Sequence, residues 1–279
     1  MNDLTINIRV DDDLDEYKGF YDYHWSKEFL KTVKPTKLQS VGFDLLASWK
    51  GTSEARRFPW LMINAVDAAV EGSLQFTTPF SSQILNELAH RITTGLERKH
   101  LSLSGDDRES LCTEIRSIES EISHRVKTNP VRLDPKELWT HFLQNQGISL
   151  SLLMSEVNAY AAVYFAYEFY LIRSVKVCTA VKSIRTRGLP KRLNELLGEK
   201  VAETCWNAKK IDLARLIRHS IVHNGRKLTD NLEKYRSELT LEDDEIVIMA
   251  HHTTELYTLL KERALLFTTE MVKLPICRF

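Results

Sequence analysis

The sequence lacks several features that would assign it to a well-known class. Its four cysteines are far apart among 279 residues, so there is no CxxC motif for redox chemistry or zinc. It has no excess of either charge, because 38 Lys and Arg balance 38 Asp and Glu. Its apolar share of 43% and charged share of 27% are ordinary for a globular protein. This composition excludes a disordered, collagen-like or disulfide-stapled chain, and the length suits one large domain or two small ones.

Signals for secretion or membrane insertion are also missing. Residues 1–17 are acidic and contain no apolar core, unlike a signal peptide. The most apolar stretch, 157–172, is shorter than the roughly 20 residues that span a bilayer, and Asn158 and Glu168 interrupt it. Without a disulfide pattern, a reducing compartment is the default. We therefore expect a cytoplasmic protein that has no membrane partner.

Three common nucleotide and hydrolase motifs do not occur. The sequence has no GxxxxGK[ST], no GxGxxG and no GxSxG. NTPase, dinucleotide-binding and serine-hydrolase functions therefore have no support from motifs.

The hydrophobic pattern predicts an all-α protein. Apolar residues recur at helical spacing in 38–92, and Leu111, Ile115, Ile118 and Ile122 form a further stripe. Two prolines in 128–136 indicate a domain boundary. We expect a mostly helical N-terminal region of unknown role at 1–135, with an acidic start at 1–30, and a helical bundle at 136–279.

Within the second region, a long apolar helix at about 149–183 is expected to be the buried spine of the bundle. Shorter helices are expected near 193–197 and at 211–223, and a final helix at 253–271. Between them, 239–241 and 246–248 flank the residues EDDE, a pattern typical of a small β-hairpin insertion. Cys178 and Cys205 are expected to be core thiols.

The zero net charge hides an uneven distribution. The segment 173–227 contains 14 basic and 4 acidic residues, whereas 1–30 contains 8 acidic and 3 basic residues. Many of these side chains are expected to be solvated individually. A basic block surrounding a histidine-bearing helix nevertheless suits a ligand with a phosphate backbone, such as RNA.

The helix expected at 211–223 carries a candidate site. At about 100° per residue, one face holds an apolar set and the opposite arc holds polar residues. The apolar set is Leu213, Leu216, Ile217 and Ile221, and the polar set is Arg215, Arg218, His219 and His223. Val222 at the centre of the polar arc suggests that another subunit covers part of this face. Asn224–Gly225 predicts the C-terminal cap.

Arginine and histidine together suit RNA cleavage. A neutral imidazole accepts the proton of a ribose 2′-OH, and an imidazolium protonates the 5′-oxygen that leaves. A guanidinium neutralises the charge that develops on the phosphorus. This chemistry needs no metal or other cofactor, and it yields a 2′,3′-cyclic phosphate and a 5′-hydroxyl.

The stretch from Arg215 to Arg226, RLIRHSIVHNGR, resembles the signature of the HEPN family. That signature is Arg, a polar residue, three further residues and His at the end of a helix. The resemblance covers about 145–275. It implies a small helical bundle of the kind found in toxins, abortive-infection proteins, anticodon nucleases and CRISPR-linked ribonucleases.

The resemblance also implies roles for particular residues. Arg218 and His223 are the implied catalytic pair, and His219 is the polar residue beside Arg218, where Asn is commoner. The family usually builds its site from two motif copies at a dimer interface, so one copy implies a homodimer. The implied acidic residue of the first long helix is Glu156 or Glu168. A carboxylate at 168, deep in the apolar stretch, needs a partner such as an arginine.

These observations predict a metal-independent endoribonuclease that acts as a toxin or in antiviral defence. Its substrate-binding candidates are Arg215, Arg226 and Lys227, and its expected partners are RNA, a second copy of the chain and a regulatory protein. The alternative is a non-catalytic HEPN-like module that binds nucleotides or RNA or assembles with proteins. A zinc site on His219 and His223, completed by His251 or His252, is a further alternative, although HExxH and a nearby cysteine are lacking.

Overall fold

A computed structural model describes residues 13–65, 90, 105–106, 109–110, 113–114, 135–179, 181 and 183–278. The boundary expected at 128–136 and most of the helical pattern in 66–92 and 111–122 lie outside these residues. Regular structure in the described part is mostly helical, with a two-stranded sheet, so the all-α prediction is confirmed at this level.

The longer helices are α1 (Tyr23–Val33), α2 (Gln39–Arg56), α5 (Pro135–Leu143), α6 (Gln146–Thr179), α7 (Leu189–Leu197), α9 (Lys209–His223) and α11 (Ala250–Lys273). The single-turn helices are η1 (Leu14–Tyr17), η2 (Thr186–Gly188), α8 (Glu199–Ala202), α10 (Asp230–Glu233), η4 (Arg236–Glu238) and η5 (Pro275–Cys277), with a π-helical turn at η3 (Glu203–Asn207). The predicted hairpin is confirmed as β1 (Leu241–Glu242) paired with β2 (Glu245–Ile246), although both strands are shorter than expected and each includes one residue of EDDE.

Residues 1–60 and 140–279 form one compact unit, and residues 61–139 form a second. This division differs from the predicted regions 1–135 and 136–279, because α1 and α2 pack with α6 and α11. Helical spacing shows that α2 has an apolar face, but it does not show which helix covers that face.

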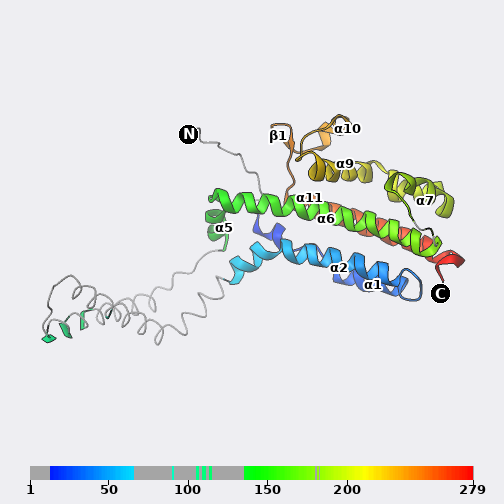
Figure 1. The fold of residues 1–279 in the computed structure, drawn as a ribbon. Coiled ribbons are helices and arrows are strands. Elements are labelled where there is room, and N and C mark those ends of the chain that lie inside the picture. The colour runs from blue at the N-terminus through cyan, green and yellow to red at the C-terminus, as the bar shows by residue number, and fades with distance from the viewer. Residues whose placement is uncertain are drawn as a thin grey trace. The chain divides into compact units, whose positions relative to one another are not determined.

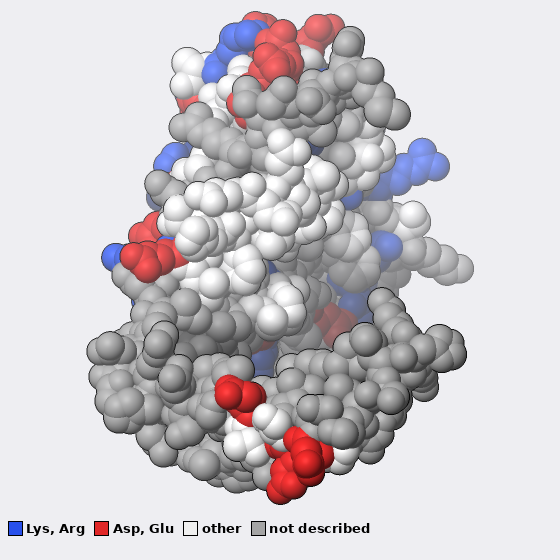
Figure 2. Space-filling model, turned by 90° about the vertical axis from the view of Figure 1, so that its left-hand side faces the viewer, with Lys and Arg blue, Asp and Glu red and all other residues white. Residues whose placement is uncertain are grey.

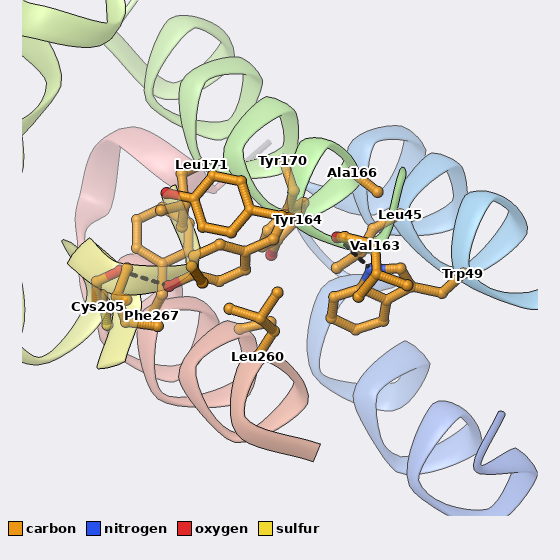
Figure 3. Close-up of a cluster of buried hydrophobic side chains, with 14 of the residues drawn as sticks. Leu45, Trp49, Val163, Tyr164, Ala166, Tyr170, Leu171, Cys205, Leu260 and Phe267 are labelled. Carbon is orange, nitrogen blue, oxygen red and sulfur yellow. Dashed lines mark hydrogen bonds between the residues drawn. The ribbon is translucent and has the colours of Figure 1, made fainter. Parts of the chain in front are cut away.

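Helix α6 lies at the centre of the first unit, in contact with α2, α9 and α11 (Figure 1). Side chains from α2, α6, α11 and η3 fill the core between these elements (Figure 3). The Trp49 indole donates a hydrogen bond to the carbonyl of Val163 at 3.0 Å, and the Tyr167 hydroxyl donates one to the carbonyl of Cys205 at 2.6 Å. The polar ends of these large aromatic groups are therefore satisfied inside the core.

The expectation that α6 is a buried spine is correct for half of its residues and wrong for one face. Met154, Phe165 and Phe169 are exposed, while the tyrosines between them are buried. The helix has 34 residues and is long and apolar enough to cross a membrane by length and composition, although the stretch 157–172 suggested otherwise. Half of its most apolar window is buried inside the protein, a pattern that a core helix also gives.

The cysteines correct another expectation. Cys178, predicted as a core thiol, forms a disulfide with Cys277, which joins the end of α6 to η5. The carbonyl of Cys277 also accepts a hydrogen bond from the backbone of Lys37 at 3.0 Å. Cys205 is a buried free cysteine, as predicted, and burial raises the pKa of its thiol to about 12. The disulfide was not predictable because 99 residues separate its two cysteines.

Candidate functional site

Helix α9 forms where it was predicted, two residues earlier at its start. Its fully buried positions are Ile211, Ala214, Ile217 and Ser220, whereas Leu213, Leu216 and Ile221 are only half-buried. The buried face is therefore rotated about the helix axis from the expected one, toward Arg218. As a result, Arg218 is half-buried instead of standing free in solvent.

The C-terminal end of α9 is closed by the predicted cap. Gly225 has φ of 58°, and the backbone N–H of Arg226 donates to the carbonyl of Ser220 at 3.1 Å. This bond spans seven residues, one more than the longest bond of a Schellman motif, and it closes the helix over a residue whose positive φ favours glycine. The Ser220 hydroxyl, which is buried, also donates to the carbonyl of Lys227 at 2.6 Å. These bonds hold His223 at the last position of an ordered helix.

His219 and His223 are both exposed and lie one helical turn apart. Their ring centroids are 4.7 Å apart, at an interplanar angle of 48°. Val222 beside them is 50% exposed, which agrees with its predicted place on the outer arc. The outer side of α9 therefore offers two imidazoles and an uncovered apolar side chain.

Arg218 rests on an aromatic ring from the neighbouring helix. Its guanidinium carbon lies 5.7 Å from the centroid of Phe165 on α6. Its Nε is buried without a hydrogen-bond partner, and the side chain forms no ion pair with any residue that the structure describes. The buried Nε is out of reach of a ligand, so the donors that Arg218 can offer to one are those of its two terminal nitrogens.

The other basic candidates differ in whether an acidic side chain is already paired with them. Arg215 bonds to Asp212 and lies 5.1 Å over the ring of Trp206. Arg226 is paired with Glu245 at 2.7 Å. Lys227 is exposed, and its backbone pairs with Glu245. Within the described residues, the Lys227 ammonium has no acidic partner, so it is the freest of the three cations.

Acidic and basic side chains gather over α10 and the hairpin, at the top of Figure 2. Arg236 pairs there with Asp244 at 2.7 Å, and the backbone N–H of Leu228 donates to the carbonyl of Asp244 at 2.9 Å. The hairpin thus holds the loop that follows α9. Its carboxylates neutralise part of the basic block, including Arg226.

Asp212 orients the first turn of α9. Burial raises the pKa of this carboxyl, but the hydrogen bond from the Tyr235 hydroxyl at 2.9 Å and the charges of Arg215 and Lys234 outweigh burial. The net result is a pKa below the ordinary value for aspartate. Asp212 therefore stays ionised and holds Arg215 against the helix.

The two acidic candidates of α6 lie in different surroundings. Glu156 is paired with Arg56 of α2 at 2.9 Å, and the side chains are 2% and 0% exposed. The Thr253 hydroxyl also donates to Glu156 at 3.2 Å. Glu156 therefore has the arginine partner that a buried carboxylate needs, within the core.

Glu168 is 8% exposed and makes no ion pair with the described residues. Its charge influences the pKa of the buried Tyr164 hydroxyl, and so do the charges of Arg215 and Arg218. Burial raises the pKa of Tyr164 far above its ordinary value; Glu168 adds to this rise, and the two arginines oppose it. Of the two carboxylates, Glu168 is the one that shares surroundings with Arg218.

The sequence did not single out Phe165 and Phe169. Their rings are stacked, with centroids 5.7 Å apart and an interplanar angle of 13°. They border a groove of about 650 Å³ between α2 and α6. Their i, i+4 spacing is visible in the sequence, but the buried tyrosines nearby have the same spacing, so the pattern alone could not identify the exposed pair.

The geometry gives the zinc alternative no support among the described residues. No group of three or more His, Cys, Asp or Glu side chains in that part of the chain is arranged to hold a metal ion. His252, a predicted third ligand, accepts a hydrogen bond at Nδ1 from the backbone N–H of Met249 at 3.1 Å. It caps the start of α11.

No protein-family model, curated protein or solved structure matches this chain.

Proposed function

We propose that this protein is a metal-independent endoribonuclease of the HEPN type, in which Arg218 and His223 carry out the reaction. The observation that carries the proposal is the state of these two residues. Arg218 is a cation without an acidic partner in the described chain, and His223 is an exposed imidazole at a rigidly capped helix end. Both belong to the strongly basic segment 173–227.

In the proposed reaction, His223 accepts the 2′-OH proton of the ribose, and the oxygen attacks the adjacent phosphorus. The bond from phosphorus to the 5′-oxygen breaks, and an imidazolium protonates that oxygen. Arg218 neutralises the charge that develops on the phosphoryl oxygens. His219, with its ring 4.7 Å from that of His223, is placed to orient it or to share the proton transfer. Lys227 would hold a neighbouring phosphate.

A homodimer is part of the proposal. The two proton-transfer roles call for two imidazoles on opposite sides of the phosphate, and a second copy of α9 would supply the second set. In this arrangement the subunit contact would cover Val222, which is 50% exposed next to both histidines. The mass of the protein in solution tests it directly.

The decisive experiment measures cleavage of single-stranded RNA by the purified protein in EDTA. Arg218→Ala should lower the rate by about 10²- to 10³-fold through lost charge stabilisation. His223→Ala should lower it by about 10²- to 10⁴-fold through lost proton transfer. Product ends are identified by mass spectrometry, with 2′,3′-cyclic phosphate expected.

Matched controls are Arg278→Ala and His24→Ala, two exposed residues away from α9 that should leave cleavage unchanged. Cleavage that persists equally in Arg218→Ala and His223→Ala would refute the proposal. RNA binding without cleavage would favour the alternative, a non-catalytic module on the same scaffold.

A further inference from the structure

The exposed face of α6 presents a pair of aromatic rings. Phe165 and Phe169 are 49% and 45% exposed and stack on one another one helical turn apart. Large apolar side chains that are grouped at a surface usually mark a binding site. The face has no charged residue between Met154 and Phe169, because Glu156 and Glu168 are buried.

A guanidinium group lies close to each of the two rings. Arg218 of α9 lies 5.7 Å from the centroid of Phe165, and Arg173 lies 5.3 Å from that of Phe169. Arg173 is in turn bonded to Asp44 of α2. A pair of exposed rings flanked by cations combines surfaces for flat apolar groups with donors for phosphates.

The groove beside the rings adds hydrogen-bonding groups. Its α2 wall carries Asp44, Ser48 and Thr52, among apolar residues from both helices. The Ser48 hydroxyl donates to the carbonyl of Asp44, and the Thr52 hydroxyl donates to that of Ser48, both within their own helix. Their oxygens remain free to accept from a ligand. A largely apolar groove of about 650 Å³ with few polar groups resembles a small-molecule or base-binding site.

We infer that Phe165 and Phe169 form a stacking platform for unpaired nucleobases of single-stranded RNA, beside the groove between α2 and α6. The inference rests on the proposed function and adds to it a site that binds the bases of the substrate. Stacking suits any base, and it requires bases that are not already stacked in a duplex. A base stacked on the exposed part of the Phe165 ring would bring the adjoining phosphate next to Arg218, since that guanidinium lies 5.7 Å from the centroid of the same ring.

A protein partner is the other occupant to consider. An apolar protein surface that covered the rings would also have to desolvate Arg218, which has no acidic partner in the described chain. RNA supplies a base for each ring and a phosphate for Arg218, whereas Arg173 is already paired with Asp44. The observations therefore favour RNA.

The test is a binding measurement that does not depend on cleavage. The probe is a fluorescent single strand of about 12 nucleotides with 2′-O-methyl riboses, which cannot undergo attack by a 2′-OH. A second strand of the same length has abasic sites at its central positions, and a third probe is the same sequence as a duplex. The wild type should bind the first probe more tightly than either of the others.

Phe165→Ala and Phe169→Ala should each weaken binding of the first probe by about 5- to 150-fold. They should bind the abasic strand as the wild type does. Phe165→Leu keeps an apolar side chain at this position and should lose most of the same preference, because it lacks an aromatic face. Phe43→Ala is the matched control, an exposed phenylalanine of α2 that does not line the groove, and it should change nothing.

Three results would overturn the platform: equal binding of base-bearing and abasic strands by the wild type, unchanged affinity in both alanine variants, or dissociation of a dimer by these variants with RNA affinity intact. The last result would identify the pair as a subunit contact. A base-dependent loss of binding in a protein that cleaves no RNA supports the platform and removes the nuclease proposal. If the wild type cleaves RNA and the alanine variants change neither binding nor KM, the nuclease proposal is supported and the platform is refuted.

Discussion

Arg56 and Arg218 show two ways in which this fold uses an arginine. Arg56 at the end of α2 is fully buried and donates to Glu156, to the Thr254 hydroxyl at 3.0 Å and to the carbonyls of Glu16 and Ala250 at 2.8 and 2.6 Å. Arg218 on α9 is half-buried against Phe165, with no acidic partner in the described residues. One guanidinium is saturated with protein acceptors, and the other is not.

The difference separates a structural charge from a candidate functional one. The bonds of Arg56 connect α2 with η1, α6 and α11, so it stabilises the arrangement of those elements. Arg218 makes no comparable set of bonds, so its charge contributes little to the stability of the fold. A cation that is partly desolvated without a carboxylate has more to gain from an anionic ligand than one already paired.

The same substitution at both arginines sharpens this comparison most strongly. Arg56→Met should lower the free energy of unfolding by about 3–5 kcal/mol, because it leaves Glu156 as an unpaired charge in the core. Arg218→Met should lower it by about 1 kcal/mol or less, mainly through the lost contact with Phe165. Urea unfolding at neutral pH measures both.

The double variant Arg56→Met, Glu156→Leu serves as the control for this pair. It removes both charges together and should recover much of the lost stability. An equal loss of stability in Arg56→Met and Arg218→Met would contradict the distinction drawn between them.

The two buried glutamates of α6 should show a smaller contrast of the same kind. Glu156→Gln removes the counter-charge of Arg56 but keeps an acceptor, and we expect a loss of about 2 kcal/mol. Glu168→Gln should change stability by about 1 kcal/mol or less, because no ion pair with a described residue is lost. Thermal unfolding of the two variants side by side is sufficient, and a larger loss for Glu168→Gln would indicate that it is the structural carboxylate.

Asp212 gives a small expected effect that depends on pH. Its pKa is lower in the folded protein than in the unfolded chain, so its contribution to stability is complete above about pH 4 and is lost as the pH falls below that value. Asp212→Asn should lower stability at pH 7 by about 1 kcal/mol, because the contacts with Tyr235, Arg215 and Lys234 lose a charged acceptor. It should also reduce the loss seen between neutral pH and about pH 3. Urea unfolding across this range measures the effect, and Asp230→Asn at an exposed position is the control. An unchanged acid dependence in Asp212→Asn would contradict this assignment.

Patterns of residues close together in the sequence correctly predicted the helices and turns that are stabilised by contacts between such residues. The apolar spacing on α9, its Asn224–Gly225 cap and the hairpin around EDDE all form where the sequence indicated. Each depends on residues a few positions apart, whose contacts follow from helix and turn geometry. The proposed site lies on one such element, so its residues could be identified from sequence.

Long-range partners could not be predicted in this way. The pairs Arg56–Glu156 and Cys178–Cys277 each join residues about 100 positions apart, and no spacing rule connects them. The exposed face of α6 is another case. Its phenylalanines and tyrosines follow the same helical spacing, and only the packing of α2, α9 and α11 decides which of them are covered.

By itself, then, the sequence determined a mostly helical chain with few cysteines, no excess charge, and a basic segment around one helix that carries arginine and histidine. The tertiary structure decided that Arg56, and not Arg218, receives a carboxylate, and that Phe165 and Phe169 stay at the surface. The physical reason is that helix formation depends on neighbours along the chain. The availability of a charge or a ring depends on which distant elements pack against it.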